Sequence, residues 1–296
     1  MTAALPSSHS EWLNLFFHIS SILHVPPTRT SELPDLDGCT AARLIDHTLL
    51  APAATSDEIS ALCAEAREHQ FRTVCVRSNH VIQAKEKLAG SDVGVASVMG
   101  FPSDDKTPSF TTDQKTTEAI NAVSDGATEL DMVLNYGALK EGAQASDDRP
   151  SNYTAVYEDV LAVRKAVPDQ ILLKVIFETS QLTSEDVARA SVICCLAGAD
   201  FVKTSTGFRG PGATAENVLL MRTVCDLCKS EGLTSKRVQV KASGGIRTIE
   251  DVRKMVSVGA GRIGASAGVA IMRGLKNNNS KVTKDDTATS TAKNWT

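Results

Sequence analysis

The sequence predicts an α/β protein folded as a single closed barrel of eight parallel strands, and three observations lead to this fold class. Short β-branched or apolar runs alternate with amphipathic runs of helical length, which is typical of repeated βα units. There are eight such apolar runs, the number that a closed parallel barrel needs. Polar residues gather at the C-terminal ends of several runs, where barrels place their active sites, whereas an open doubly wound sheet gathers them at one switch point.

The strands are recognised as short apolar segments, most of them rich in β-branched residues, which favour strands. In chain order, the predicted strands are Arg43–His47, Thr73–Val76, Gly94–Met99, Glu129–Leu134, Leu172–Phe177, Phe201–Thr204, Val238–Lys241 and Arg262–Gly264.

Helices are predicted in the segments that separate these strands. Ser56 and Thr183 are expected to be N-caps, because an acidic residue follows each of them in the next turn. Strands and helices together make a (β/α)8 TIM barrel, for which a chain of 296 residues is long enough. The predicted helices are Ser56–His69, Ser78–Leu88, Asp113–Ser124, Tyr153–Lys165, Thr183–Leu196, Ala215–Lys229, Ile249–Val258 and Ala265–Leu275.

The barrel is predicted over residues 38–275, with an appended segment at each end. Residues 1–37 form an N-terminal extension. Pro26, Pro27 and Pro34 set it apart and suggest an appended segment with a loose linker, which we expect to carry no catalytic residues. Residues 276–296 have almost no apolar side chains, so we expect a flexible, disordered C-terminal tail.

Composition argues against several classes of partner. The formal net charge is −4, so there is no basic excess to bind the phosphate backbone of nucleic acid. The apolar stretch from Trp12 to Val25 is too short to span a bilayer, and no Lys or Arg precedes it as in a secretory signal. We interpret the seven cysteines as free thiols of a cytoplasmic protein. The C-x-x-C from Cys225 to Cys228 lacks the second pair of a zinc site, and we predict no metal and no cofactor.

Three lysines stand in predicted strands, where apolar neighbours make a buried charge costly. They are Lys174 in LLKVIFET, Lys203 in ADFVKTSTG and Lys241 in VQVKASGG. A structural ion pair or an outward-facing side chain would explain any one of them. Three that converge with the strand aspartate Asp131 favour a functional site, because neighbouring ammonium groups in a dry interior lower each other's pKa.

A neutral amine produced in this way can attack a carbonyl group. The resulting imine, once protonated, withdraws electrons from the adjacent carbon–carbon bond, which is what aldol cleavage requires. Asp131 is a candidate for proton transfer on the substrate hydroxyl and the carbinolamine, directly or through water. Its alternative role is to neutralise a buried lysine.

Glycines and small hydroxyl residues follow the last predicted strands, in TSTGFRGPGAT, ASGGIRT and RIGASAG. Such loops let backbone N–H groups and helix N-termini face an anion, and parallel barrels commonly bind phosphate after strands seven and eight. A turn would explain any one of them, but their recurrence at successive strand ends predicts a phosphate site. Its candidates are Gly207, Gly244, Gly245, Gly264 and Ser266, with Arg209 and Arg247 as further sources of charge.

These segments resemble the deoxyribose-phosphate aldolase family of class I, Schiff-base-forming aldolases. The resemblance rests on the ordered motifs LIDHTLLAP, VCVRSNHV, VGVASVMGFP, ELDMVLNYGAL, LLKVIFET, GADFVKTSTGF, VKASGGIRT and RIGASAG. It implies a lyase of deoxyribonucleotide catabolism that reversibly cleaves 2-deoxy-D-ribose 5-phosphate to D-glyceraldehyde 3-phosphate and acetaldehyde. It also implies a sugar phosphate as the ligand, and it leaves a homodimer open.

The resemblance implies roles for individual residues as well. Lys203, in the K-T-S-T-G segment, would form the Schiff base, and Lys241 would lower its pKa. Asp131 would join Lys241 and a water in proton transfer. Supporting residues would be Lys174 and Asp46, the latter being equally well explained as a structural partner of a neighbouring histidine or lysine.

The chain departs from the family pattern in two places. Phe208 and Arg209 follow TSTG where some relatives have a phosphate-contacting lysine, and the loop KEGAQASDDRPSNYT after the fourth strand is longer than the family needs. Three alternative functions stay open. A metal-dependent aldolase would need converging histidines, whereas the six histidines here are scattered. A phosphate-binding isomerase would not need paired lysines, and a barrel without catalysis would only bind a sugar phosphate.

Overall fold

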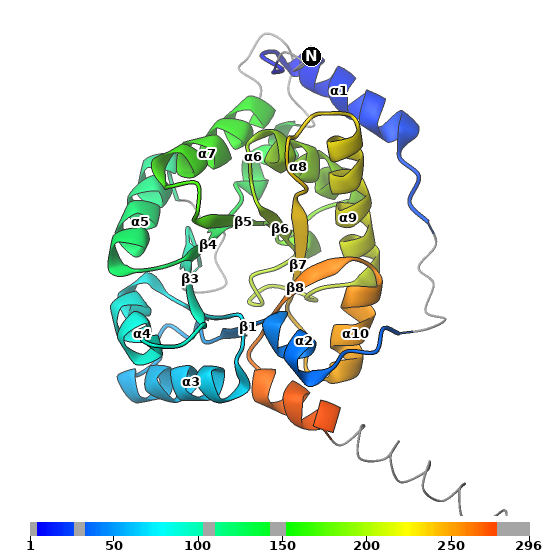
Figure 1. Cartoon of the computed structure of the whole chain (residues 1–296). Coiled ribbons are helices and arrows are strands. Elements are labelled where there is room, and N and C mark those ends of the chain that lie inside the picture. Colours follow the sequence, from blue (N-terminus) through cyan, green and yellow to red (C-terminus); the bar gives the residue numbers. More distant parts are fainter. Residues whose placement is uncertain (1–4, 27–32, 103–109, 143–151, 277–296) are drawn as a thin grey trace, which may run out of the picture.

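The computed structural model describes residues 5–26, 33–102, 110–142 and 152–276. In this part of the chain, eight parallel strands close into a barrel, and the last strand pairs with the first, Gly264 opposite Asp46 (Figure 1). This closure confirms the predicted barrel over an open doubly wound sheet. The strands are β1 (Ile45–Thr48), β2 (Thr73–Val76), β3 (Gly94–Met99), β4 (Glu129–Val133), β5 (Leu172–Ile176), β6 (Phe201–Lys203), β7 (Gln239–Ser243) and β8 (Ala260–Ala265).

Helices surround the barrel and connect successive strands (Figure 1). Thr183 caps its helix as predicted, but Thr55 replaces Ser56 as the cap of the first one, because the Thr55 side chain accepts a hydrogen bond from the backbone N–H of Glu58. The surrounding helices are α3 (Ser56–His69), α4 (Val81–Leu88), α5 (Thr112–Asp125), α7 (Asn152–Ala166), α8 (Ser184–Leu196), α9 (Ala215–Ser230), α10 (Ile249–Ser257) and a last helix over 268–276.

The described ranges also contain helical segments that the sequence pattern did not predict. Arg43 ends one of them, so the first strand begins two residues later than predicted. Another occupies the start of the long loop after β4, whose residues 143–151 lie outside the described part of the chain. The additional segments are α1 (His9–Ile22), α2 (Gly38–Arg43), α6 (Tyr136–Gly142) and the short 3₁₀ turn η2 (Thr179–Gln181), while the first three residues of the predicted helix Ser78–Leu88 form the 3₁₀ turn η1 (Ser78–His80).

The helix α1 lies in the N-terminal extension, yet it packs on the barrel helices α7 and α9. Its residues Trp12, Phe16 and Ile19 are buried in the same hydrophobic core as the barrel. The indole Nε1 of Trp12 donates a hydrogen bond of 2.9 Å to Oγ1 of Thr154, and the Phe16 ring meets Tyr153 edge-on. The first part of the extension is therefore a helix packed on the barrel, which the sequence pattern did not predict.

Both ends of the chain reach beyond what the structure describes. The predicted C-terminal tail lies outside the described residues from 277 onward. Across the described ranges, no helix combines the length and apolar character that crossing a membrane requires.

Candidate active site

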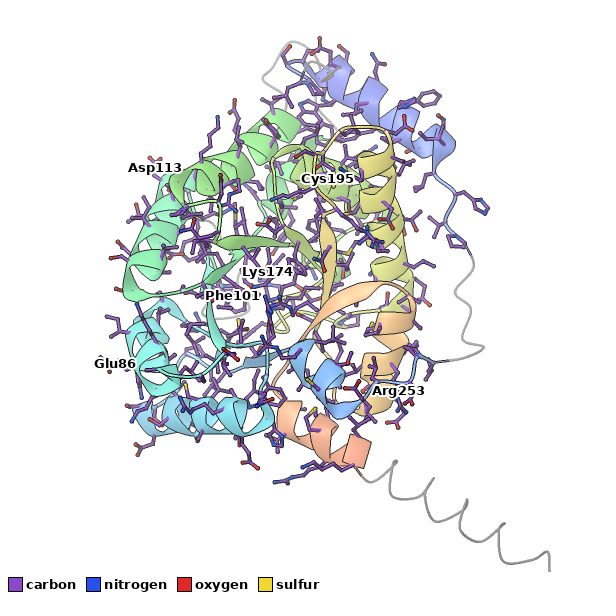
Figure 2. The ribbon with its side chains drawn as sticks, in the orientation of Figure 1. Glu86, Phe101, Asp113, Lys174, Cys195 and Arg253 are labelled. Atoms are coloured by element: carbon purple, nitrogen blue, oxygen red, sulfur yellow. The ribbon has the colours of Figure 1, made fainter. Side chains whose placement is uncertain are left out.

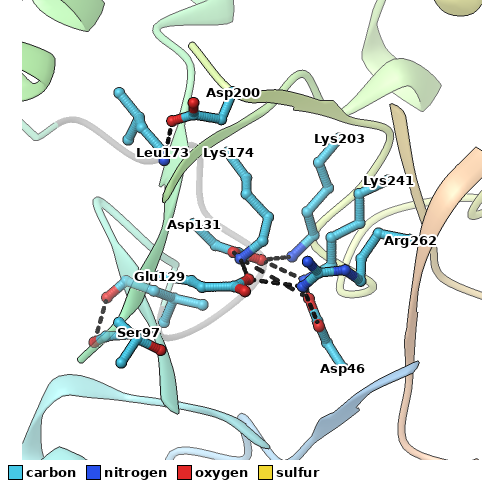
Figure 3. Close-up of polar contacts among 12 residues, drawn as sticks. Asp46, Ser97, Glu129, Asp131, Leu173, Lys174, Asp200, Lys203, Lys241 and Arg262 are labelled. Atoms are coloured by element: carbon cyan, nitrogen blue, oxygen red, sulfur yellow. Dashed lines mark hydrogen bonds and ion pairs between the residues drawn. The ribbon is translucent and has the colours of Figure 1, made fainter. Parts of the chain in front are cut away.

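The inside of the barrel carries a cluster of charged side chains. They project from β1 and from β4 to β8, and at most 4% of each residue's surface is exposed (Figure 3). One of them, Lys174, is labelled inside the barrel in Figure 2. Buried charges are tolerated when they are paired and hydrogen-bonded, which is the case for every member of this cluster. The charge cluster consists of Asp46, Glu129, Asp131, Lys174, Lys203, Lys241 and Arg262.

Asp131 lies at the centre of the charge cluster (Figure 3). Its Oδ1 accepts a hydrogen bond of 2.6 Å from Nζ of Lys174. Its Oδ2 accepts one of 2.7 Å from Nζ of Lys203 and one of 2.8 Å from Nζ of Lys241. The structure thus brings together the three strand lysines and the aspartate that the sequence singled out.

Two further carboxylates each hold one of these lysines. Asp46 accepts a hydrogen bond of 2.5 Å from Nζ of Lys241, and Glu129 pairs with Nζ of Lys174 at 2.7 Å. Nη1 of Arg262 bridges the two carboxylates, at 2.7 Å from Oδ1 of Asp46 and 2.7 Å from Oε2 of Glu129. Asp46 is therefore a partner of Lys241 and Arg262, while the neighbouring histidine pairs with Glu65 instead.

Glu129 and Arg262 are members of this site that sequence analysis did not single out. Strand alternation contains the signal, because residues two apart share a face of a strand. Glu129 stands two residues before Asp131, and Arg262 stands two residues before Gly264, so both face the barrel interior.

Among the three lysines, Lys203 has the fewest carboxylate partners. It pairs with Asp131 alone among the described residues, whereas Lys241 also has Asp46 and Lys174 also has Glu129. Burial lowers the pKa of Lys203, and the nearby ammonium of Lys241 lowers it further, so that Asp131 does not restore the ordinary value. Burial also acts on Lys241 and Lys174, but their additional carboxylates outweigh it and raise the pKa of both. Lys203 is therefore the amine that loses its proton first.

A cavity of about 460 Å³ opens above Lys203 at the C-terminal end of the barrel. Of the three strand lysines, Lys203 is the one that lines it, together with Arg247. All the candidate phosphate residues of the sequence analysis, Gly207, Gly244, Gly245, Gly264 and Ser266, lie in its wall.

Two of these glycines are required by the geometry. Gly244 has a φ angle of 91°, a left-handed backbone conformation that residues other than glycine rarely adopt. A Cβ atom on Gly264 would stand 2.2 Å from Oγ of Ser243. The backbone thus forms a part of the cavity wall where side chains are excluded.

Apolar side chains also contribute to the lining of this cavity. Phe208, the residue that departs from the family pattern, lines the cavity and meets the Phe101 ring edge-on at a centroid distance of 5.4 Å. Phe101 belongs to a small apolar cluster with Leu50, Cys75 and Val98. Cys75 is fully buried in this cluster and is not among the residues that line the cavity.

Glu178 is a further residue of the barrel mouth that the sequence did not reveal. It follows β5 with φ 58° and ψ 60°, a strained conformation for a residue with a side chain. Its Oε2 accepts hydrogen bonds from the hydroxyl and the backbone N–H of Thr206, which lines the cavity. Its Oε1 is buried with no hydrogen-bond partner among the described residues, and burial raises the pKa of the carboxyl group.

The family of the chain follows from a comparison with known proteins. A sequence model of the DeoC/LacD family aldolases matches residues 40–275, the whole barrel. The chain belongs to the DeoC/LacD aldolase family. The predicted aldolase family, its class as a lyase and its barrel fold are thereby confirmed.

Curated relatives of this aldolase carry a more specific name. A deoxyribose-phosphate aldolase of Coccidioides immitis (strain RS) is 47% identical over 276 residues, which cover 93% of this chain and 95% of the relative. One of Lysinibacillus sphaericus (strain C3-41) is 47% identical over 234 residues, 79% of this chain and 95% of its own length.

Solved structures agree with this assignment. A crystal structure of a putative deoxyribose-phosphate aldolase from Coccidioides immitis matches 92% of this chain and 98% of its own chain, at 45% identity and a TM-score of 0.79. The structure of a tetrameric deoxyribose phosphate aldolase from Aeropyrum pernix matches 82% of this chain and 93% of its own chain, at 30% identity and a TM-score of 0.68.

Proposed function

We propose that this aldolase reversibly cleaves 2-deoxy-D-ribose 5-phosphate to D-glyceraldehyde 3-phosphate and acetaldehyde, through a Schiff base on Lys203. The names of the relatives supply the reaction. The single observation that supports the mechanism is that Lys203 both lines the cavity and has a lowered pKa, while Lys174 and Lys241 do neither. A deprotonated amine next to a substrate cavity is what attack on an aldehyde requires.

The reaction begins at the aldehyde carbon C1 of the open-chain sugar. Nζ of Lys203 adds to C1, and loss of water from the carbinolamine gives an iminium ion. The iminium takes up the electron pair of the C2–C3 bond as the C3 hydroxyl gives up its proton, so that glyceraldehyde 3-phosphate leaves and an enamine stays on the lysine. Protonation at C2 and addition of water then release acetaldehyde and the free amine.

We assign the proton transfers to Asp131 and Lys241, acting with a water molecule. The lysines around Asp131, Lys174 first among them, outweigh the effect of burial and hold its pKa well below the ordinary value, so it is a carboxylate at neutral pH. Lys241 has a raised pKa and stays an ammonium ion, which keeps Lys203 neutral by repulsion. Lys174 and Asp46 are supporting residues: Lys174 neutralises Asp131, and Asp46 holds the charge of Lys241.

We assign the phosphate group of the substrate to the glycine-rich wall of the cavity. Backbone N–H groups near Gly207, Gly244, Gly245 and Gly264, with the hydroxyl of Ser266, are the proposed donors. Arg247 lines the same cavity and supplies positive charge, whereas Arg209 is not among the lining residues. We therefore propose Arg247 as the charge partner that replaces the lysine of other relatives.

Reductive trapping tests the Schiff base directly. With acetaldehyde and borohydride, we expect an ethyl group on Lys203, found by mass spectrometry of peptides. The variant Lys203→Leu should lose both the trapped group and the cleavage of deoxyribose 5-phosphate. Retained cleavage in this variant would refute the assignment, and a lasting loss of wild-type activity after EDTA would support a metal-dependent aldolase instead.

The assembly and location of the aldolase stay predictions. We propose a homodimer in the cytoplasm, and we note that the Aeropyrum pernix relative is described as a tetramer. Sedimentation analysis of the purified protein distinguishes a monomer, a dimer and a tetramer.

A further inference from the structure

The N-terminal end of the barrel, opposite the Lys203 cavity, contains a second cavity of about 310 Å³. Its lining residues stand at the beginnings of strands: Phe201 opens β6, Gln239 opens β7, and Arg72 directly precedes β2. Four arginines line it, namely Arg43, Arg72, Arg237 and Arg262, together with the carboxylate of Asp200.

The carboxylate of Asp200 does not neutralise these arginines. Its Oδ1 accepts a hydrogen bond of 2.6 Å from Lys236, and its Oδ2 accepts one of 3.1 Å from Arg164 and one of 2.8 Å from the backbone N–H of Leu173. Neither Lys236 nor Arg164 lines the cavity, so Asp200 is already paired with cations outside it.

The four arginines differ in their carboxylate partners. Nη1 of Arg43 donates to the backbone carbonyls of Phe71 and Asp92, and Arg43 forms no ion pair within the described ranges. Arg72 pairs with Glu129 at 3.7 Å, and Arg262 pairs with Glu129 and Asp46, but these two carboxylates also hold Lys174 and Lys241. Among the residues that line the cavity, four guanidinium groups therefore stand against one carboxylate, so the lining itself has an excess of positive charge.

Arg237 completes the positive lining from the β7 side. Its guanidinium forms two hydrogen bonds with Asp226, and its side chain is 63% exposed, so it can reorient toward a ligand at little cost. Gln239 adds an amide donor to the same side of the cavity. A concave surface of one charge concentrates the field and attracts ions of the opposite sign.

We propose that this cavity is a second anion site, for a small molecule with two linked phosphate groups. Guanidinium groups bind phosphate oxygens through two parallel hydrogen bonds, which makes arginine the preferred partner of phosphate in such sites. Arg43 and Arg72 approach from the β1–β2 side and Arg237 from the β7 side. Strand β8 lies between β1 and β7, so two strand spacings of roughly 4.8 Å separate the two sides; one phosphate does not span them, whereas a diphosphate can contact both.

The site is connected to the charge cluster of the barrel. Arg262 lines the cavity, and its Nη1 binds Asp46 and Glu129, the carboxylates that hold Lys241 and Lys174 (Figure 3). An anion bound to Arg262 would be separated from Lys241 by Asp46 and from Lys174 by Glu129.

Binding of inorganic pyrophosphate tests the proposal without any assay of catalysis. The test protein carries Ser266→Asp, since a carboxylate in the Lys203 cavity repels phosphate there and leaves the N-terminal end as the site measured. By calorimetric titration at low salt, we expect one pyrophosphate bound per chain. Adding Arg43→Gln and Arg237→Gln should weaken binding at least about tenfold, because each charged hydrogen bond contributes roughly that factor.

The matched control is Arg273→Gln, which removes an exposed arginine outside both cavities and should leave binding unchanged. The single variant Arg237→Gln changes a largely exposed side chain and covers the case in which the double variant fails to fold. If the Ser266→Asp protein binds no pyrophosphate, or binds it equally well without Arg43 and Arg237, the proposed site does not exist.

Discussion

At the scale of single residues, the number of carboxylates around each lysine explains the different protonation of chemically identical side chains. Lys203 and Lys241 share Oδ2 of Asp131, but Lys241 also has Asp46. The two ammonium groups repel each other, and one of them has to lose its proton to remove this repulsion. Lys203 loses it more easily than Lys241, because fewer carboxylates stabilise the charged form of Lys203.

This explanation predicts the effect of removing Lys241. In Lys241→Leu, the repelling charge is lost, the pKa of Lys203 rises toward the ordinary lysine value of about 10.4, and activity at neutral pH falls about tenfold for each unit of the rise. The acid limb of the kcat/KM profile against pH should move to higher pH. Lys241→Arg, which keeps the charge, should keep the limb near its wild-type position. If Lys241→Leu is slower but has an unchanged pH profile, Lys241 does not control Lys203.

Glu178 carries a second prediction at this scale. It accepts two hydrogen bonds from Thr206, three residues after Lys203, so it fixes the loop that forms the cavity wall. Loss of both bonds in Glu178→Ala should raise KM for the sugar phosphate by about tenfold, since a hydrogen bond to such a group contributes about 1–2 kcal/mol. Glu178→Gln keeps an acceptor oxygen and should stay close to the wild type. Equal KM values in the two variants would show that the bonds to Thr206 do not position the loop.

The sequence predicts the lysines of this site better than their partners. Lys174, Lys203 and Lys241 were recognisable because a buried lysine in an apolar strand is costly and needs a reason. Glu129 begins its strand next to a loop, so the sequence suggests an exposed end, and its contact with Arg262 of β8 depends on the barrel's closure. The left-handed backbone of Glu178 has no signature in the sequence, since glycine or asparagine is expected there.

At the scale of secondary structure elements, the periodicity of the sequence predicts the strands and the outer helices, but it does not predict the packed helix α1. Trp12, Phe16 and Ile19 are spaced like one face of a helix, but the prolines after them suggested a linker, and periodicity alone does not reveal which surface receives that face. The surface that receives α1 contains Tyr153 of α7, which lies 141 residues after Trp12 in the sequence, so no local pattern links the two.

The packing of α1 predicts that it stabilises the barrel without taking part in catalysis. Trp12 is fully buried, so Trp12→Ala should lower the free energy of unfolding by about 3–5 kcal/mol, measured by denaturant titration. Trp12→Phe keeps most of the ring and loses the hydrogen bond to Thr154, which should cost about 1 kcal/mol beyond the smaller area. As a control, Leu13→Ala changes an exposed neighbour and should have little effect. A Trp12→Ala protein as stable as the wild type would mean that α1 does not remain packed in solution.

At the scale of the whole molecule, one network of charges runs through the barrel from the arginines at its N-terminal end to Lys203 at its C-terminal end. Burial alone would raise the pKa values of Asp46, Glu129 and Asp131, but the surrounding lysines and Arg262 outweigh it and lower all three. Carboxylates of this kind stabilise the fold above the pKa that they have in the unfolded chain, about 3.9–4.3, and this stabilisation is lost as the pH falls toward their folded values.

The stability of the aldolase should therefore depend on pH through these carboxylates, and Glu129 allows the dependence to be measured apart from the residues assigned to the reaction. At neutral pH, Glu129→Gln leaves Lys174 and Arg262 with one carboxylate fewer and should lower the free energy of unfolding by about 3–5 kcal/mol. The difference from the wild type should shrink below about pH 4, because acid protonates the wild-type carboxyl group in the unfolded chain and then in the folded protein. Glu68→Gln, an exposed change outside the network, should show no such dependence. If the cost of Glu129→Gln is the same at neutral and acid pH, the side chain contributes through packing and not through its charge.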